Sequence, residues 1–237
     1  MKKIIISLIL LVAVAISVVM QACGGSVFGD KISEGVITYK LEYNDSNPNS
    51  SLIMMLPPQM TMSFKDNSTM MAIKGYVGCF VLNTIANYSK RQNYTTLSVG
   101  LFDQKYLLVN EFGDAPFGTD AMSDIVITQK PDTMSICGYL CHKAEGYSEQ
   151  CKRNFTFWYT KDLDINSDCI LSPVKSIDGV MMEFEVEMMG IYMKARAVEV
   201  SRMEIPDEIF EKPEGFREVT RAQLEDVIHT FDGSKSN

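Results

Sequence analysis

The sequence predicts a mainly β protein built on a strongly curved antiparallel sheet. Three observations favour this fold class. Short segments of alternating apolar and polar residues recur between turn-forming residues, two of these segments pair in a self-consistent register, and helical patterns are confined to a few short stretches. The chain has 237 residues, a length that suits one all-β domain.

The register is clearest in residues 181–200, where two alternating segments meet at Met189 and Gly190. A turn there predicts two kinds of cross-strand pair, one on each face of the hairpin: Glu185 with Lys194 and Glu183 with Arg196 on a charged face, and Val186 with Met193, Phe184 with Ala195 and Met182 with Ala197 on an apolar face. A slip of one residue would turn every glutamate to the apolar side, so the pattern specifies its own register. We interpret the charged face as solvated and not as a catalytic carboxylate cluster.

The other elements follow in order along the chain. Strands are predicted at 35–43, 59–65, 69–74, 79–88, 94–99, 105–110, 125–130, 133–136, 140–145 and 154–160. Residues 51–59 break the alternation and end in two prolines, which predicts a short helix or a lid segment. Residues 161–180 form a long connection, and 206–210 a helical turn. A short helix is predicted at 220–231, with Thr220 as its N-cap and an apolar stripe along one side.

The N-terminus has the pattern of an export signal. Two lysines precede the apolar stretch Ile4–Met20, and Cys23 follows a small residue at its end. This arrangement resembles the bacterial lipoprotein cleavage box, which implies cleavage before Cys23 and lipid attachment to its sulfur; an uncleaved anchor and plain secretion are the alternatives. We therefore predict a signal peptide at 1–22, a lipid-anchored tether at 23–30, one β-rich domain at 31–231 and a tail at 232–237.

The charge balance limits the partners. The signal holds two of the 22 basic residues and none of the 30 acidic ones, so the formal charge of the processed chain is close to −10. Such a surface disfavours nucleic acid and anionic headgroups. The membrane is therefore predicted to be contacted through the N-terminal lipid.

The cysteines predict at least one disulfide in an oxidising compartment. Five remain after Cys23, an odd number, so at least one is left over within the chain. Our candidates for the disulfide are Cys141 with either Cys151 or Cys169.

Catalytic and metal-binding patterns are sparse. The sequence contains two histidines, and His142 follows Cys141 in a predicted strand, so their side chains point to opposite faces. It contains no glycine-rich phosphate loop, nucleophile elbow or HExxH motif. We therefore predict no enzymatic activity, no metal and no cofactor.

Methionine is the unusual component: 14 of the 16 lie after the signal, many on apolar faces. Methionine adapts to varied apolar ligands such as acyl chains, although it also serves as an ordinary core residue. The residues predicted to line a ligand-binding concave face are Met60, Met62, Phe64, Phe184, Val186 and Met193.

Several stretches together resemble one family. They are GVITYKLEY at 35–43, ICGYLCHKA at 136–144, FWYTKD at 157–162, MMGIYMKARAVEV at 188–200 and FEKPEGFREV at 210–219. Their order and spacing are similar to those of an uncharacterised family of Gram-negative envelope lipoproteins, a domain of unknown function similar to the LolA/LolB/LppX group. The resemblance implies an open half-barrel whose concave apolar face is closed by short helices and binds an acyl chain or another lipid, and it implies no catalytic residues. The presence of Cys79 and Cys137 departs from the family pattern.

Two functions follow as expectations. The first is a lipid-anchored envelope protein, in the outer membrane and facing the periplasm, that binds or shields an apolar ligand. The alternative is a structural or interaction lipoprotein with a filled core that docks another envelope protein.

Overall fold

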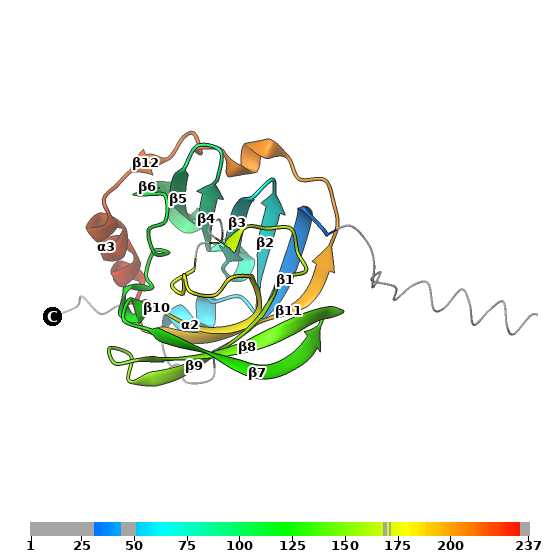
Figure 1. Cartoon of the computed structure of the whole chain (residues 1–237). Coiled ribbons are helices and arrows are strands. Elements are labelled where there is room, and N and C mark those ends of the chain that lie inside the picture. Colours follow the sequence, from blue (N-terminus) through cyan, green and yellow to red (C-terminus); the bar gives the residue numbers. More distant parts are fainter. Residues whose placement is uncertain (1–30, 44–50, 168–169, 171, 233–237) are drawn as a thin grey trace, which may run out of the picture. The chain divides into compact units, whose positions relative to one another are not determined.

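The computed structural model describes residues 31–43, 51–167, 170 and 172–232 (Figure 1). Residues 31–237 form one compact unit. The predicted signal, the tether with Cys23, and Cys169 lie outside the described residues.

Twelve strands form the described part of the domain. They are β1 (Glu34–Glu42), β2 (Gln59–Lys65), β3 (Ser68–Lys74), β4 (Phe80–Asn87), β5 (Gln92–Val99), β6 (Gln104–Glu111), β7 (Val126–Ile136), β8 (Tyr139–Ser148), β9 (Arg153–Thr160), β10 (Val180–Met188), β11 (Ile191–Ser201) and β12 (Arg217–Glu218). Single-turn 3-10 helices lie between some of them: η1 (Tyr76–Gly78), η2 (Gly100–Phe102), η3 (Asp120–Met122) and η5 (Asp207–Phe210). The prediction of a mainly β protein is confirmed.

All twelve strands belong to one sheet, in the order β12-β6-β5-β4-β3-β2-β1-β11-β10-β9-β8-β7. Neighbours along the chain pair as antiparallel hairpins from β1 to β6 and from β7 to β11, and β1 joins the two series by pairing with β11. The two-residue strand β12 pairs in parallel with β6, so the sheet is mixed. Its two outer strands, β12 and β7, do not pair with each other, and the sheet is not closed.

The predicted hairpin register is confirmed. Strands β10 and β11 pair Glu185 with Lys194 and Val186 with Met193, together with two more of the predicted pairs. The fifth, Met182 with Ala197, is not among the paired residues, since the register of β10 is irregular between Met181 and Glu183, where it pairs with β9. Both turn residues have positive φ, 53° and 76°, as a two-residue hairpin of matching twist requires.

The interpretation of its charged face as solvated is wrong at Glu183, which is 5 % exposed. Lys194 Nζ lies 2.8 Å from one carboxylate oxygen of Glu183, and Arg196 pairs with the other, so two long cationic side chains cover a single acid. Lys194 thus pairs diagonally and not with the residue opposite it. Glu185 instead accepts a hydrogen bond from the backbone N–H of Thr156, at 2.7 Å.

Strand β7 replaces two predicted strands. The alternation is interrupted at Pro131, which has no backbone N–H to donate. The structure continues the strand across this point with a register irregularity between Gln129 and Thr133. Because β7 is an outer strand of the sheet, a proline is tolerated there.

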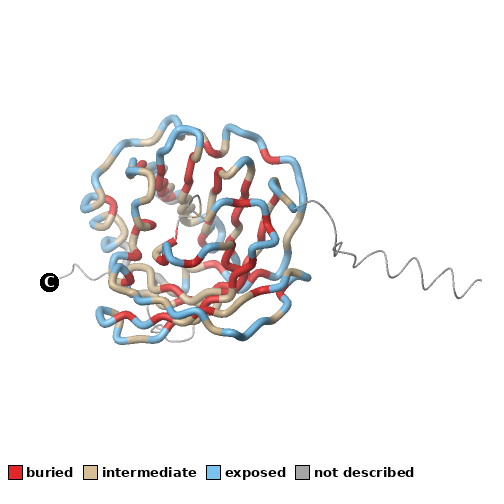
Figure 2. The backbone as a smooth tube through the Cα atoms, viewed as in Figure 1, coloured by how far each residue is buried: buried red, intermediate tan, exposed pale blue. Residues whose placement is uncertain are grey.

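The main core lies on the face of the sheet formed by alternate residues of β1, β2 and β8–β11. Its buried members include Ile37, Tyr39, Phe64, Phe155 and Phe157. The long connection 161–179 contributes Leu163, Ile165, Val174 and Ile177 to the same cluster. Figure 2 shows that the buried residues are concentrated in the strands and the exposed residues in the turns that join them.

Residues 202–219 cover the opposite face of β4–β6. Ile205 and Phe210 from this segment form a second cluster with Ile85, Tyr94 and Leu107. These strand residues alternate with those on the core face, so this part of the sheet is buried on both sides.

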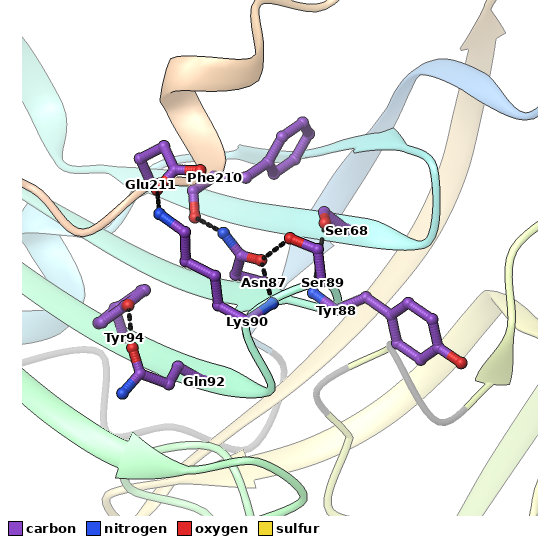
Figure 3. A network of polar contacts seen from close by, with 9 residues as sticks. All are labelled: Ser68, Asn87, Tyr88, Ser89, Lys90, Gln92, Tyr94, Phe210 and Glu211. Carbon is purple, nitrogen blue, oxygen red and sulfur yellow. Dashed lines mark hydrogen bonds and ion pairs between the residues drawn. The ribbon is translucent and has the colours of Figure 1, made fainter.

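A polar network holds this covering segment to the β4–β5 turn (Figure 3). The Asn87 side-chain amide donates to the backbone carbonyl of Phe210, at 3.1 Å, while its oxygen accepts from the backbone N–H of Lys90, at 3.0 Å. Lys90 forms an ion pair with Glu211. One buried asparagine therefore organises both the turn and the segment that crosses it.

The described residues contain two α-helices, α2 (Ser51–Met55) and α3 (Arg221–Asp232), and neither has the length and hydrophobicity needed to span a membrane. The predicted N-cap of α3 is confirmed. Thr220 Oγ1 accepts from the backbone N–H of Gln223, at 3.3 Å, and Gln223 Oε1 accepts from the backbone N–H of Thr220, at 2.9 Å, which is a capping box. Leu224 then points into a third cluster with Leu97, Val99 and Phe117.

Loss of the cap should loosen the helix without altering the sheet. Thr220→Ala is expected to lower the free energy of unfolding by about 1 kcal/mol, because the first turn loses a partner for one of its N–H groups. Urea denaturation followed by circular dichroism measures this. Thr230→Ala is the control, since that hydroxyl bonds the Asp226 carbonyl inside the same helix and its loss should change stability by less than about 0.5 kcal/mol. Equal losses for both variants would contradict the capping role.

Candidate functional site

An apolar cavity of about 320 Å³ lies between the core face of the sheet and the two helices. Met55 and Leu56 reach it from α2 and the residue after it, and Ile228 reaches it from α3. The strands and their connections supply the rest of the wall: Tyr43, Ile73, Cys79, Phe80, Leu82, Leu97, Val99, Phe102, Met188, Met189, Ile191 and Met193. Four of the lining residues are methionines, whose side chains adapt to irregular apolar shapes.

The wall offers almost no polar chemistry. None of the described residues that line it is charged. The Tyr43 hydroxyl is already engaged, since it donates to the Pro57 carbonyl at 2.7 Å, and burial raises the pKa of this tyrosine. The remaining polar atom is the Cys79 thiol. A chamber of this kind can hold a hydrocarbon chain but cannot recognise a polar head inside it.

The sequence-predicted lining residues fall into three groups. Met193 lines the 320 Å³ cavity. Met62, Phe184 and Val186 line a separate space of only about 30 Å³, about the room of one water molecule. Met60 and Phe64 are buried in the main core, at 4 % and 0 % exposure, and border neither space.

Packing explains why the middle of the core face is filled. The Phe184 ring meets the Tyr39 ring edge-on, with 5.7 Å between their centroids, and the Tyr39 hydroxyl donates to the Met181 carbonyl at 2.9 Å. Ile170 and Pro173, from the long connection, close the small space from the other side. The larger cavity lies beyond this region, at the end of the sheet where α2 and α3 sit (Figure 1).

Four of the cavity residues that sequence reasoning missed lie on β4 and β5. Phe80 and Leu82 alternate along one strand, and Leu97 and Val99 along the next, with Leu82 paired opposite Leu97. That alternation indicates a shared apolar face. It does not indicate which part of the face remains unfilled, because this depends on where distant helices dock.

Of the two predicted disulfide pairings, one is not formed in the structure, and the other involves Cys169, which lies outside the described residues. Cys141 and Cys151 are both free thiols in the structure, so the Cys141–Cys151 pairing is not formed there. Cys141 is buried in β8 with Sγ directed at the Tyr139 carbonyl, 3.6 Å away, whereas Cys151 lies in the β8–β9 turn with Sγ 3.1 Å from the Ala121 carbonyl. Burial raises the pKa of the Cys141 thiol to about 11, which leaves it largely un-ionised at neutral pH.

The β10–β11 turn is held against the cavity by Gly118. The backbone N–H of Met189 donates to the Gly118 carbonyl at 2.7 Å. Gly118 has φ +80°, and a Cβ atom added there would lie 2.6 Å from Met189 Cγ. The glycine therefore lets the chain pass directly beside a side chain that forms part of the cavity wall.

Gly118→Ala tests this coupling. Both the positive φ and the displaced Met189 should lower stability, by about 1–2 kcal/mol for the backbone alone. The shifted methionine should also weaken uptake of a fluorescent fatty acid several-fold. Gly113→Ala is matched, because it shares a positive φ of +91° but its Cβ would meet nothing within 4 Å. If both variants bind the probe equally, Met189 does not control the cavity.

Comparison with known proteins identifies the fold more than the function. No family model and no curated protein matches the chain. Among solved structures, the chain is similar to PNGF-II in two crystal forms, with TM-scores of 0.54 and 0.51 and 13 % identity in both. The similarity covers 84 % of this chain but only 34 % and 33 % of PNGF-II. The chain thus spans about a third of the length of PNGF-II, and the likeness concerns the β architecture alone.

Proposed function

We propose that this chain is a lipid-anchored cell-envelope protein that binds a single apolar chain, such as an acyl chain, in the 320 Å³ cavity beneath α2 and α3. The observation that carries the proposal is the pairing of that volume with a wall free of charged groups. An apolar cavity of about 150 Å³ accommodates one benzene ring, so this one suits roughly a dozen carbon atoms. Dispersion and burial supply the affinity, at about 0.8 kcal/mol per CH₂.

The architecture also supports the proposed binding of an apolar chain. A sheet with helices placed over one end of its core face is consistent with the open half-barrel implied by the resemblance to the LolA/LolB/LppX group. In this proposal the polar head of the ligand stays at the cavity entrance and the protein carries out no chemistry on it. The protein is held at the outer membrane, facing the periplasm, by lipid on Cys23.

Ligand uptake is tested on residues 24–237, which are the processed chain without Cys23, exported through a cleavable signal. Native mass spectrometry of the purified protein should show an added mass that organic extraction removes. The extracted protein should then bind a fluorescent fatty acid of about 12 carbons in a saturable way. A homogeneous mass without ligand, together with no uptake of the probe, would contradict the proposal.

The anchor is tested separately on the full chain in a Gram-negative host. Metabolic labelling with palmitate should mark the protein, and cell fractionation should place it in the outer membrane. Cys23→Ala should lose both the label and the membrane association. If the label persists in this variant, Cys23 is not the site of lipid attachment.

One observation favours the alternative of an interaction module with a filled core. Strand β7 is an outer strand of the sheet, and much of its length is exposed, with Val126 exposed as well. Exposed outer strands can pair with a partner strand. In this alternative the 320 Å³ cavity takes up no probe, and a partner protects the β7 amides from hydrogen exchange.

A further inference from the structure

The connections at the cavity end of the sheet carry large apolar side chains that face solvent. Val77 is 91 % exposed, Tyr76 70 %, Met54 69 % and Phe102 62 %. We call these four residues the apolar collar. They come from η1, α2 and η2, three segments that are distant in sequence.

Strand pairing shows that these segments meet at one end of the sheet. The last residue of β5, Val99, pairs with the first residue of β4, Phe80, so η1 and η2 leave the sheet side by side. The backbone N–H of Gly100 donates to the Cys79 carbonyl at 3.0 Å and ties the two connections together. On β2, which follows α2, the second residue pairs with Ile73 near the end of β3, so α2 lies at the same end.

The segments that carry the collar border the cavity. Phe102 lines the cavity and is also largely exposed, so the cavity reaches the surface at η2. Cys79 and Phe80, which directly follow η1, line it as well, and so does Met55, which follows Met54. A surface that covers the collar therefore also covers Phe102, where the cavity wall is exposed.

One residue of the collar, Val77, has an unfavourable backbone conformation. Val77 has φ 54° and ψ 21°, in the left-handed region that β-branched residues rarely adopt. The free protein thus bears two unfavourable features at one residue, since an apolar side chain is held in water by a disfavoured backbone conformation. Such strain at an exposed position indicates a function that it serves.

The chemistry of the collar fits a lipid surface. Residues 51–59, 75–79 and 100–102 contain no charged side chain, although 22 % of the whole chain is charged. Exposed lysines, Lys74 and Lys105, lie just outside η1 and η2, and the exposed Asp103 directly follows η2. Apolar tips, a tyrosine with one wet end, and flanking lysines whose stems can lie along the headgroups form the usual composition of an interfacial membrane contact.

We infer that the apolar collar docks on the surface of a lipid bilayer and seals the cavity entrance against it, so that a chain-like ligand passes between membrane and cavity without crossing water. This inference rests on the proposed function for the identity of the cargo. The docking itself requires only the collar. The overall acidic protein would thus meet the membrane through segments without charged side chains.

Vesicle flotation tests the docking with residues 24–237, which include the whole compact unit and lack Cys23. The protein is mixed with phosphatidylcholine vesicles, with and without 30 mol% phosphatidylglycerol, and the fraction that floats is measured. The wild type should float with both, and no more with the anionic vesicles, because the net negative charge of the chain offsets the attraction of Lys74 and Lys105. The double variant Tyr76→Ser and Val77→Ser should reduce partitioning at least about tenfold, because two exposed apolar groups no longer enter the interface.

The matched control is Tyr147→Ser with Val126→Ser. It removes the same two residue types from exposed positions on β8 and β7, away from the collar. The control should float like the wild type. Flotation lost equally in both variants, or absent from the wild type, would overturn the inference, as would collar-dependent self-association without vesicle binding.

Uptake of the fluorescent fatty acid from vesicle-free solution separates this inference from the proposed function. Tyr76 and Val77 do not line the cavity, so the collar variant should bind the free probe like the wild type. It should be slower only in taking the probe from vesicles. Normal uptake from solution by a wild type that fails to float would reject the docking and leave the cavity proposal standing.

Discussion

Filling the cavity with aromatic side chains should abolish uptake of the fatty acid while leaving the domain folded. Leu82 on β4 and Ile191 on β11 both line the cavity and are only partly buried, so larger side chains there can extend into the empty space. In the double variant Leu82→Trp and Ile191→Trp, two indoles would occupy much of the 320 Å³. We expect affinity for the probe to fall at least about 100-fold, because the ligand loses most of the surface that it would bury.

Stability is the second measurement on this variant. Overpacking a filled core costs about 1–3 kcal/mol per site, whereas filling a void costs little or is favourable. The variant should therefore unfold at a similar urea concentration to the wild type. Leu140→Trp with Val198→Trp is the control, since both positions are exposed and outside the cavity. Unchanged uptake in the filled variant would show that the probe binds elsewhere.

The features that sequence predicted well are specified by residues close in the chain. The β10–β11 register follows from alternation and opposite charges on both sides of Met189–Gly190. The start of α3 follows from Thr220 and the glutamine three residues later. In both cases the interacting groups lie within one turn or one hairpin, so the pattern in the sequence carries the geometry.

The position of the cavity could not be predicted in this way. Met62 and Leu82 occupy the same face of the sheet, and both belong to alternating segments. Met62 is buried because the connection 161–179 packs over it, whereas Leu82 borders the cavity beneath α2 and α3. The connection and α3 lie about 100 residues or more further along the chain, and α2 precedes Leu82 across a separate strand pair, so the local sequence pattern does not predict where these segments dock.

The burial of the Glu183 carboxylate likewise could not be predicted from the sequence. Sequence placed it opposite Arg196, which is correct. Its burial follows from the addition of Lys194, which reaches it diagonally, and from the packing of Trp158 on the neighbouring strand β9. A cross-strand pair can be predicted from register, but the exposed fraction of a carboxylate depends on every side chain that surrounds it.

Phe64 provides the sharpest test of where the core ends and the cavity begins. Sequence assigned it to the ligand-binding face, whereas the structure buries it completely in the main core, outside the cavity. Phe64→Ala should lower the free energy of unfolding by about 3–5 kcal/mol, since it removes a fully buried ring and leaves a void. Urea denaturation measures the loss, with Phe102→Ala as the matched change at a largely exposed ring, where less than about 1 kcal/mol is expected. Ligand binding is the second measurement on this variant. Under conditions in which the Phe64→Ala protein remains folded, it should bind the fatty acid like the wild type, because the void left by the missing ring lies apart from the cavity. A small loss of stability together with weakened uptake would instead place Phe64 at the ligand and return the binding face to the middle of the sheet.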